Sequence, residues 1–444
     1  MARAVIPASS GAISLPLVSA TIAVVGTGYV GLTTGAYLAH LGHTVVCADV
    51  VPEKVERLNR GEIPILEAGL SELVREGLDS GRLSFVLGAA AAVGEAEFVF
   101  LCVPTPQGED GAADLSYVRR AASEIASSLG PECVVINKST VPVGSTRVVE
   151  RAIGRDDVYV VSNPEFLREG SAVHDCLHPD RIVIGSDDQS AAMRVAGLFA
   201  ALRAPLVITD PASAETIKYA SNAFLATKVS FVNALANVCE AVGADVREVV
   251  LGMGHDRRIG FEFLKPGPGW GGSCFPKDTR AMVRIAEDAG YDFGLLRGVI
   301  TVNDEQYERM VDKVERTLGS TLEGCHVAVW GLTFKARTDD LRDSPAIEVV
   351  RRLQARGARV QAYDPTVTEA GPPLAGIEVV ADPYAPCEGA DVLVVLTEWD
   401  EFRWLDFNKV AGSMATPRIV DTRNLLEAAA IRRLGFTYTG LGRD

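Results

Sequence analysis

The sequence predicts an α/β protein with two doubly wound, Rossmann-like domains joined by a long central helix. Short β-branched segments alternate with helical segments over residues 21–210 and again over 319–444. This alternation is typical of parallel sheets that carry helices on both faces. Residues 211–318 show helical periodicity without a strand pattern, and 444 residues suffice for about three domains.

Residues 1–20 form a separate N-terminal extension in this division. The extension is apolar, but Arg3 is its only basic residue, and Pro7 and Pro16 interrupt the run. A signal peptide needs a basic start and an unbroken apolar core. We therefore expect a lead into the first strand, and no other segment is apolar enough to span a membrane.

The composition narrows the range of partners and compartments. A net charge of −15 repels phosphate backbones, so we do not expect nucleic acid as a partner. Eight cysteines without a C-x-x-C pair favour reduced thiols and a cytoplasmic location. His174 and His178 have a zinc-like spacing, but Pro179 follows directly and no further ligands cluster nearby. We therefore expect no metal.

The expected strands follow from short runs of valine and isoleucine, which suit the buried strands of a parallel sheet. In the first domain they cover residues 21–26, 44–50, 84–87, 97–104, 133–137, 158–162, 181–186 and 205–210. In the last domain they cover residues 325–332, 359–365, 377–382, 390–399 and 418–424, with a helix over 344–357.

The central region begins with a helix signal. Asp210 can cap the helix, and Pro211 suits its first position. Apolar residues recur at every seventh position on one face of this helix: Ile217, Phe224, Phe231 and Val238. Such a stripe packs either a core or a seam between subunits.

The segment "GTGYVG" carries a dinucleotide fingerprint. It places Gly26, Gly28 and Gly31 after a strand and before a helix, where glycines allow a tight turn and the approach of a pyrophosphate. Asp49 ends the second strand, where the ribose-binding acid belongs. A carboxylate there would repel a 2′-phosphate, so the pattern favours NAD over NADP. The alternative for Asp49 is an ordinary turn residue.

Further polar residues follow later strands of the first domain. Thr105 and Thr140 lie in turns at strand ends, where ligands of such sheets bind. Asn163 can cap a short helix that would place Glu165 and Glu169 on one face, four residues apart. Two carboxylates together suggest acid–base chemistry, although a solvated helix face is the alternative.

Two groups in the central region also point to catalysis. Lys218 and Asn222 are i, i+4 neighbours beside the apolar stripe and could stabilise an oxyanion. The alternative is a surface lysine with a surface asparagine.

The segment "GWGGSCFPKD" surrounds Cys274 with Gly271 and Gly272 on one side and Lys277 and Asp278 on the other. The glycines permit close approach of backbone and ligand, and a nearby cation favours a thiolate. This setting suggests a nucleophile, and the alternative is a small core residue in a tight turn.

Seven motifs together resemble the UDP-glucose 6-dehydrogenase family, part of the nucleotide-sugar dehydrogenases that include GDP-mannose dehydrogenases. The resemblance runs from about Thr21 to near the C-terminus and rests on these segments: "GTGYVG", "VPTP", "STVPVGST", "NPEFLREG", "KYASNAF", "RIGFEFLKPGPGWGGSCFPKDTRAM" and "GLTFKARTDDLRDSP". It implies an NAD-binding domain at 21–210, a central dimerisation region at 211–318 and a nucleotide-sugar domain at 319–444. It also implies a homodimer or a higher homo-oligomer.

The resemblance implies two successive oxidations of UDP-glucose at C6 to UDP-glucuronate, with two NAD and one water consumed. Cys274 would form a thiohemiacetal and then a thioester. Lys218 and Asn222 would stabilise oxyanions, and Asp278 would assist deprotonation through a water. Glu165, with Thr140, would activate the hydrolytic water.

The resemblance also implies two sets of binding residues. The cofactor would contact Gly26, Gly28, Tyr29, Val30, Gly31, Asp49, Lys54, Thr105, Thr140, Glu169, Lys277 and Arg342. The nucleotide sugar would contact Glu165, Phe166, Leu167, Lys218, Asn222, Arg258, Phe263, Lys265, Gly271, Phe334, Lys335 and Arg423. Arg258 would reach the substrate of the partner subunit, and the backbone of "FLKPGPGW" would hold the diphosphate and sugar.

Three alternatives remain at this point. The same chemistry could act on TDP-glucose or GDP-mannose. An epimerase or short-chain reductase would need Tyr-x-x-x-Lys, which does not occur in this sequence. A dinucleotide-binding regulator without catalysis is the third, although every expected catalytic position is filled.

Overall fold

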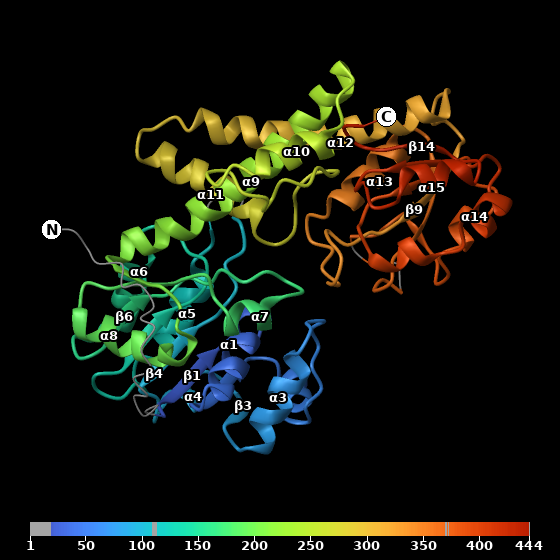
Figure 1. Ribbon diagram of the computed structural model, residues 1–444. Helices are drawn as coiled ribbons and strands as arrows, with labels where there is room; N and C mark the ends of the chain where they lie inside the picture. The colour runs from blue at the N-terminus through green and yellow to red at the C-terminus, as the bar shows by residue number, and fades with distance from the viewer. Residues whose placement is uncertain (1–18, 109–112, 369–370, 372, 444) are drawn as a thin grey trace. The chain divides into compact units, whose positions relative to one another are not determined.

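A computed structural model of the chain describes residues 19–108, 113–368, 371 and 373–443 (Figure 1). The predicted extension, residues 1–20, falls outside the described residues except for Ser19 and Ala20. The chain divides into two compact units, Met1–Ala220 and Ser221–Asp444. None of the helices in the described ranges is long and apolar enough to cross a membrane.

The first unit contains an eight-stranded sheet in the order β3-β2-β1-β4-β5-β6-β7-β8. Its strands are β1 (Thr21–Val25), β2 (Thr44–Asp49), β3 (Leu83–Leu87), β4 (Phe98–Leu101), β5 (Val134–Asn137), β6 (Tyr159–Ser162), β7 (Ile182–Gly185) and β8 (Leu206–Thr209). Neighbouring strands pair in parallel except β6 and β7, which meet in an antiparallel bridge. The first six strands have the order of a dinucleotide-binding fold.

Helices cover both faces of this sheet. They are α1 (Tyr29–His40), α2 (Pro52–Asn59), α3 (Leu70–Asp79), α4 (Ala90–Val93), α5 (Ser116–Ile125), α6 (Ser145–Ile153), α7 (Ala172–Leu177) and α8 (Gln189–Leu198), followed by a 3-10 turn at Ala200–Leu202. Alternate residues of a strand point to opposite faces. Ile22 and Val24 of β1 accordingly join one core cluster, and Ala23 and Val25 join the other.

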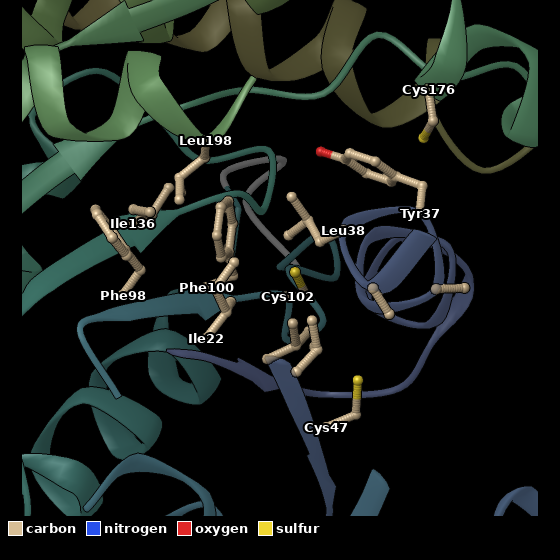
Figure 2. Close-up of a cluster of buried hydrophobic side chains, with 14 of the residues drawn as sticks. Ile22, Tyr37, Leu38, Cys47, Phe98, Phe100, Cys102, Ile136, Cys176 and Leu198 are labelled. Carbon is tan, nitrogen blue, oxygen red and sulfur yellow. The ribbon is translucent and has the colours of Figure 1, made fainter. Parts of the chain in front are cut away.

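The first of these clusters packs helix side chains onto strand side chains. Figure 2 shows Ile22, Phe100 and Ile136 from β1, β4 and β5 gathered with Leu38 of α1 and Leu198 of α8. Each is nearly or fully inaccessible to solvent. This packing fixes the strand ends that carry the predicted site residues.

Four helices follow the first sheet: α9 (Pro211–Val242), α10 (Val246–Gly254), α11 (Phe275–Asp288) and α12 (Gly294–Leu318). Asp210 caps α9, because its Oδ1 accepts a hydrogen bond of 2.8 Å from the Ser213 amide. The predicted long central helix is thus confirmed, with 32 residues.

The second unit contains a six-stranded parallel sheet in the order β11-β10-β9-β12-β13-β14. Its strands are β9 (His326–Trp330), β10 (Arg359–Tyr363), β11 (Glu378–Val379), β12 (Val392–Val395), β13 (Arg418–Asp421) and β14 (Thr437–Thr439). Its helices are α13 (Pro345–Ala355), α14 (Phe407–Ser413) and α15 (Ala428–Arg433), with 3-10 turns at Ala385–Cys387 and Asp400–Trp404. The predicted pair of doubly wound domains is confirmed, and β14 is a strand that the sequence did not indicate.

The second sheet repeats the order of the first six strands of the first sheet. It also repeats the turn after the opening strand, since Gly331 follows β9 with φ +93° as Gly26 follows β1 with φ +96°. Asp364 follows β10 and accepts hydrogen bonds from the amides of Leu332 and Thr333, 2.7 and 3.1 Å long.

Candidate active site

Two of the three fingerprint glycines are required by close packing, and the third borders open space. A Cβ on Gly26 would lie 2.6 Å from the Cys102 carbonyl oxygen, and one on Gly31 would lie 1.9 Å from the Gly26 carbonyl oxygen. Both positions therefore require glycine for close packing. A Cβ on Gly28, the N-cap of α1, would meet nothing within 4 Å. That open space at a helix N-terminus suits a diphosphate.

Asp49 forms the acidic end of this fingerprint. Its Oδ2 accepts from the Thr27 amide at 3.1 Å and from Lys54 Nζ at 2.9 Å. Burial opposes ionisation, but the hydrogen bonds from Thr27 and the Lys54 ammonium lower the pKa of Asp49 to about 2. Asp49 is therefore an anion at neutral pH, as a ribose-binding acid must be.

Glu67 is a buried carboxylate that none of the sequence motifs indicated. The Tyr29 hydroxyl donates to it, and so do the amides of Gly170 and Ala172, at 2.7 and 2.9 Å. Burial and the Glu67 carboxylate raise the pKa of Tyr29, which keeps its hydroxyl protonated. Glu67 thereby links the fingerprint to the backbone after Glu169. A lone acid in the apolar run "IPILEAGL" was the available signal.

The next two strand ends are joined by hydroxyl groups. Thr105 Oγ1 donates to the Thr140 carbonyl oxygen at 2.8 Å, and Ser139 Oγ donates to the Val103 carbonyl oxygen at 2.7 Å. Thr105 and Thr140 are both buried. The structure thus brings these two predicted residues together.

The predicted short helix after Asn163 is wrong, because residues 163–168 have no helical backbone. The Asn163 side chain does not cap a helix. Its Nδ2 donates to the Val183 carbonyl oxygen at 2.7 Å, and its Oδ1 accepts from Lys138 Nζ at 3.0 Å. Glu165 and Glu169 are therefore not neighbours on a helix face.

Glu165 is paired with Lys218 instead. Lys218 Nζ lies 2.8 Å from Glu165 Oε1, and both side chains are almost fully buried. Burial alone would raise the pKa of Glu165, but Lys218, the Leu167 amide and Lys138 lower it. The carboxylate is therefore ionised and available as a base. The surface alternative for Lys218 is excluded by its burial.

The ring of Phe166, the residue after Glu165, lies close to two cations. The Arg181 guanidinium carbon is 3.6 Å from the centre of its ring, and Lys218 Nζ is 5.5 Å away. Leu167 and Val30 pack against the first core cluster. The three residues thus anchor the walls around Glu165 and the fingerprint.

Cys274 occupies the N-cap position of α11, with Pro276 in the first turn. Its side chain is partly exposed, and Ser273 Oγ lies 3.5 Å from its Sγ. A helix N-terminus stabilises a thiolate through the helix dipole. The reading as a sealed core residue is therefore excluded.

Asp278 is fully buried one turn further along α11. Its Oδ2 accepts from Asn222 Nδ2 at 2.6 Å, and its Oδ1 lies 2.5 Å from Lys277 Nζ. The second unit therefore joins three predicted residues in one polar group. Asn222 is buried, which excludes its reading as a surface residue.

The glycines before Cys274 are required by packing within the protein. A Cβ on Gly271 would lie 1.9 Å from the Asp343 carbonyl oxygen, and one on Gly272 would lie 2.8 Å from the Phe334 ring. Gly272 also has φ +80°. The close approach expected at these positions is thus made by protein groups of the second unit.

Side chains of α9 and α12 clamp the segment before Trp270. Asn233 Oδ1 accepts from the Gly267 amide at 2.8 Å, and Asn303 Oδ1 accepts from the Trp270 amide at 2.8 Å. Gln306 Nε2 donates to the Gly267 carbonyl oxygen at 2.9 Å. The sequence did not indicate a role for Asn233, Asn303 or Gln306, because each fits the polar positions of an amphipathic helix.

The remaining predicted binding residues of the second unit differ in exposure. Arg258 is 88% exposed and pairs with Asp256, and Lys265 is exposed. The predicted cofactor residue Arg342 is also mostly exposed and pairs with Asp340.

Arg423 is mostly buried. Its Nε donates to the Leu396 carbonyl oxygen at 2.8 Å, and its Nη2 donates to the Phe334 carbonyl oxygen at 3.2 Å. Lys335 lies over the Phe334 ring, and Phe263 lies beside the Phe275 ring with φ +61°.

The two histidines with zinc-like spacing lie side by side. The rings of His174 and His178 stack 4.8 Å apart, and no group of three metal-ligating side chains occurs in the described ranges.

The apolar stripe on α9 is open to solvent in the single chain. Its residues Phe224, Phe231 and Val238 are exposed by 65%, 54% and 55%.

The fold and these residues define an NAD-dependent oxidoreductase with two Rossmann-like domains and a cysteine at a helix N-terminus. The chain belongs to the UDP-glucose/GDP-mannose dehydrogenase family. The model of the family's NAD binding domain matches residues 20–203, that of its central domain residues 212–305, and that of its UDP binding domain residues 328–428. The NAD-binding match confirms the predicted cofactor.

Known proteins resemble the chain over nearly its whole length. It is 48% identical over 433 residues to a UDP-glucose 6-dehydrogenase of Rhizobium meliloti (strain 1021), covering 95% of this chain and 99% of the relative. It is 46% identical over 441 residues to a UDP-glucose 6-dehydrogenase of Pseudomonas aeruginosa, covering 95% and 97%. A solved UDP-glucose dehydrogenase from Pyrobaculum islandicum superposes with a TM-score of 0.90 at 39% identity, covering 98% and 100%.

Proposed function

We propose that this protein oxidises UDP-glucose at C6 to UDP-glucuronate, consuming two NAD⁺ and one water. The observation that carries the proposal is Cys274 at the N-terminus of α11, one turn from the Asn222–Asp278–Lys277 group. The relatives with 46% and 48% identity act on UDP-glucose according to their names. They favour this substrate over TDP-glucose and GDP-mannose.

The cofactor site is the fingerprint of the first unit. Gly28 leaves room for the diphosphate, and Asp49 with Lys54 receives the adenosine ribose. Tyr29, fixed by Glu67, and Thr105 line the same ends of the sheet. NAD⁺, when bound, supplies a hydride acceptor for each of the two oxidations.

The first oxidation removes a proton and a hydride from the C6 alcohol and gives an aldehyde. Asp278 assists the proton transfer, because it is held as an acceptor between Asn222 and Lys277. The Cys274 thiolate then adds to the aldehyde carbon, and a thiohemiacetal oxyanion forms. Donors from Lys218 and Asn222 stabilise this oxyanion.

The second oxidation removes a hydride from the thiohemiacetal carbon and gives a thioester. Water then attacks the thioester carbonyl, the C–S bond breaks, and the carboxylate leaves. Glu165, with Thr140, takes the proton from this water, because Lys218 keeps the Glu165 carboxylate ionised. The covalent bond retains the aldehyde between the two oxidations.

The substrate's nucleotide and sugar are held by the predicted binding residues. Two of these residues directly follow Glu165 in the sequence, namely Phe166 and Leu167. Three others precede Cys274, namely Phe263, Lys265 and Gly271. Phe334, Lys335 and Arg423 form a connected set in the second unit.

Two further properties belong to the proposal. The exposed stripe of Phe224, Phe231 and Val238 meets a second copy of the chain, and the exposed Arg258 reaches the partner's substrate. Six of the eight cysteines are buried thiols, which supports a reducing compartment such as the cytoplasm.

The test is NADH formation with a panel of UDP-glucose, TDP-glucose and GDP-mannose, together with the uronate formed. We expect two NADH per UDP-glucose consumed, without free aldehyde, and at least about tenfold lower kcat/KM for the other sugars. One NADH per sugar would contradict the four-electron reaction. A preference for GDP-mannose would contradict the substrate.

A further inference from the structure

Lys138 is a buried cation that has no role in the reaction proposed above. It directly follows β5, and only 7% of the residue is accessible to solvent. Its Nζ donates to Asn163 Oδ1 at 3.0 Å, and Asn163 Nδ2 donates to the Val183 carbonyl oxygen at 2.7 Å. This chain of hydrogen bonds connects the residues that follow β5 and β6 with Val183 inside β7.

The segment that Lys138 holds carries Glu165. Asn163 lies two residues before Glu165, and the Leu167 amide donates to Glu165 Oε2 at 2.7 Å. Lys138, Asn163 and Glu165 line the same cavity in the first unit. The position of the Glu165 carboxylate therefore depends on the Asn163 side chain and on the ammonium group that fixes it.

The hydrogen-bond partner of Lys138 is the neutral side-chain amide of Asn163. Lys138 makes no ion pair in the described ranges. Burial lowers the pKa of Lys138, and the neighbouring Glu165 carboxylate opposes this by favouring the ammonium form. The Lys138 charge acts on Glu165 in return through a medium of low polarity. Burial opposes ionisation of Glu165, and Lys218 and then Lys138 lower its pKa.

Other charged and titratable groups also face this cavity. The titratable or charged side chains that line it besides Lys138 and Glu165 are Tyr37, Arg168, His174, Asp175, Cys176, His178, Asp180 and Arg181. Arg181, and Lys218 from outside the cavity lining, favour the Glu165 anion, whereas burial raises the pKa of the Cys176 thiol and keeps it neutral. Arg168 pairs with Asp175 at the cavity wall. Lys138 is thus the second of the two lysines that act on Glu165.

We propose that Lys138 is a positioning residue for thioester hydrolysis, holding the Glu165 segment through Asn163 and keeping the Glu165 carboxylate ionised. The proposal rests on the function proposed above. It assigns Lys138 to the last step alone, since both oxidations precede the use of Glu165 as a base.

The test compares Lys138→Met with Lys138→Arg by rapid mixing with UDP-glucose and excess NAD⁺. We expect Lys138→Met to form two NADH per active site at the native rate and then to turn over about tenfold more slowly. The acid limb of its plot of kcat against pH should move to higher pH, because Glu165 loses a neighbouring cation. Lys138→Arg keeps the charge and should restore the native limb.

Glu165→Gln provides the reference, since it should give the NADH burst without turnover at any pH. Lys138→Gln provides a second neutral variant that can still donate to Asn163. It decides the question if Lys138→Met does not fold in a thermal-unfolding assay.

Two results would overturn the proposal. One is a neutral variant whose acid limb stays at the native pH. The other is an equal loss of the NADH burst and of steady-state turnover, which would indicate a structural role only. Failure of the proposed function itself is seen separately, because the unmodified enzyme would then form no NADH from UDP-glucose.

Discussion

Cys274 combines two features that the proposed chemistry needs at one residue. Its thiol is partly exposed, and its place at the N-cap of α11 favours the thiolate. The neighbouring Gly271 and Gly272 fit only because no Cβ is present, so the backbone at this cysteine is held firmly. A fixed thiolate is a better nucleophile toward a bound aldehyde than a mobile one.

We expect Cys274→Ala to lower uronate formation by several orders of magnitude while NAD⁺ and UDP-glucose still bind. Cys274→Ser should give at most a slow half-reaction, because an alkoxide is harder to form than a thiolate. The readouts are NADH yield and a fluorescence titration of NADH. Cys325→Ala, at another partly exposed thiol, is the matched control and should keep native activity.

Asp49 should set the preference for NAD⁺. Asp49→Ser removes the charge that repels a 2′-phosphate and releases Lys54, now 2.9 Å from Asp49, to bind that phosphate. We expect kcat/KM with NADP⁺ to rise at least about tenfold, or 1.4 kcal/mol. Adding Lys54→Met to Asp49→Ser should cancel this rise in kcat/KM with NADP⁺. Equal use of both cofactors by the unmodified enzyme would refute this role of Asp49.

At the scale of elements, His43 connects three segments of the first unit. Its Nδ1 accepts from the Ala20 amide at 3.2 Å, and its Nε2 lies 3.1 Å from the Leu198 carbonyl oxygen. The ring is buried and must be neutral to accept and donate in this way. Burial lowers the pKa of His43 below its ordinary value near 6.5.

The pH dependence of unfolding follows from His43. Because the folded pKa lies below the unfolded one, the stabilisation is complete above about pH 6.5 and is lost as the pH falls toward the folded pKa. Each pH unit of this interval costs up to about 1.4 kcal/mol. We expect urea unfolding of the native protein to show this loss as the pH falls below about 6.5, and His43→Gln to lack it. If the free energy of unfolding changed with pH in the same way in both proteins, His43 would not be the group responsible.

The elements were predictable where burial repeats along the chain. Each strand of the first sheet appeared in the sequence as a short apolar run, because both of its faces are covered. The helix expected after Asn163 failed, since the side chain that looked like a cap binds Lys138 and Val183 from other strands. Such partners are distant in sequence, so no local pattern reveals them.

The site residues divide in the same way. Cys274 and Asp49 follow directly from motifs, because backbone geometry and chemistry act within a few residues. Glu67, Asn233 and Asn303 were missed, because each binds the backbone of a segment more than 30 positions away. Their roles depend on the tertiary structure alone.

At the scale of the whole molecule, the open stripe on α9 predicts assembly. Covering a row of large exposed apolar side chains with a partner removes apolar surface from water, which favours association. We expect a dimer or larger assembly at micromolar concentration, and Phe231→Glu should shift it to monomer in light scattering. Ala212→Glu, exposed on a different face of α9, is the control. A monomeric native protein would exclude the interface and the role of Arg258 across subunits.

The repeated strand order of the two sheets has a consequence for binding stoichiometry. In the second unit, Thr333 stands where the first unit has Gly28, so a side chain fills the place that a diphosphate needs. Asp364 is sealed as well, because Trp399 Nε1 donates to its Oδ2 at 3.1 Å beside the Leu332 and Thr333 amides. Asp49 thus pairs with a lysine whose side chain is 27% exposed, whereas Asp364 accepts from the Trp399 indole. A calorimetric titration with NADH should therefore saturate at one dinucleotide per chain, so the two NAD⁺ of each turnover must pass through a single site in succession.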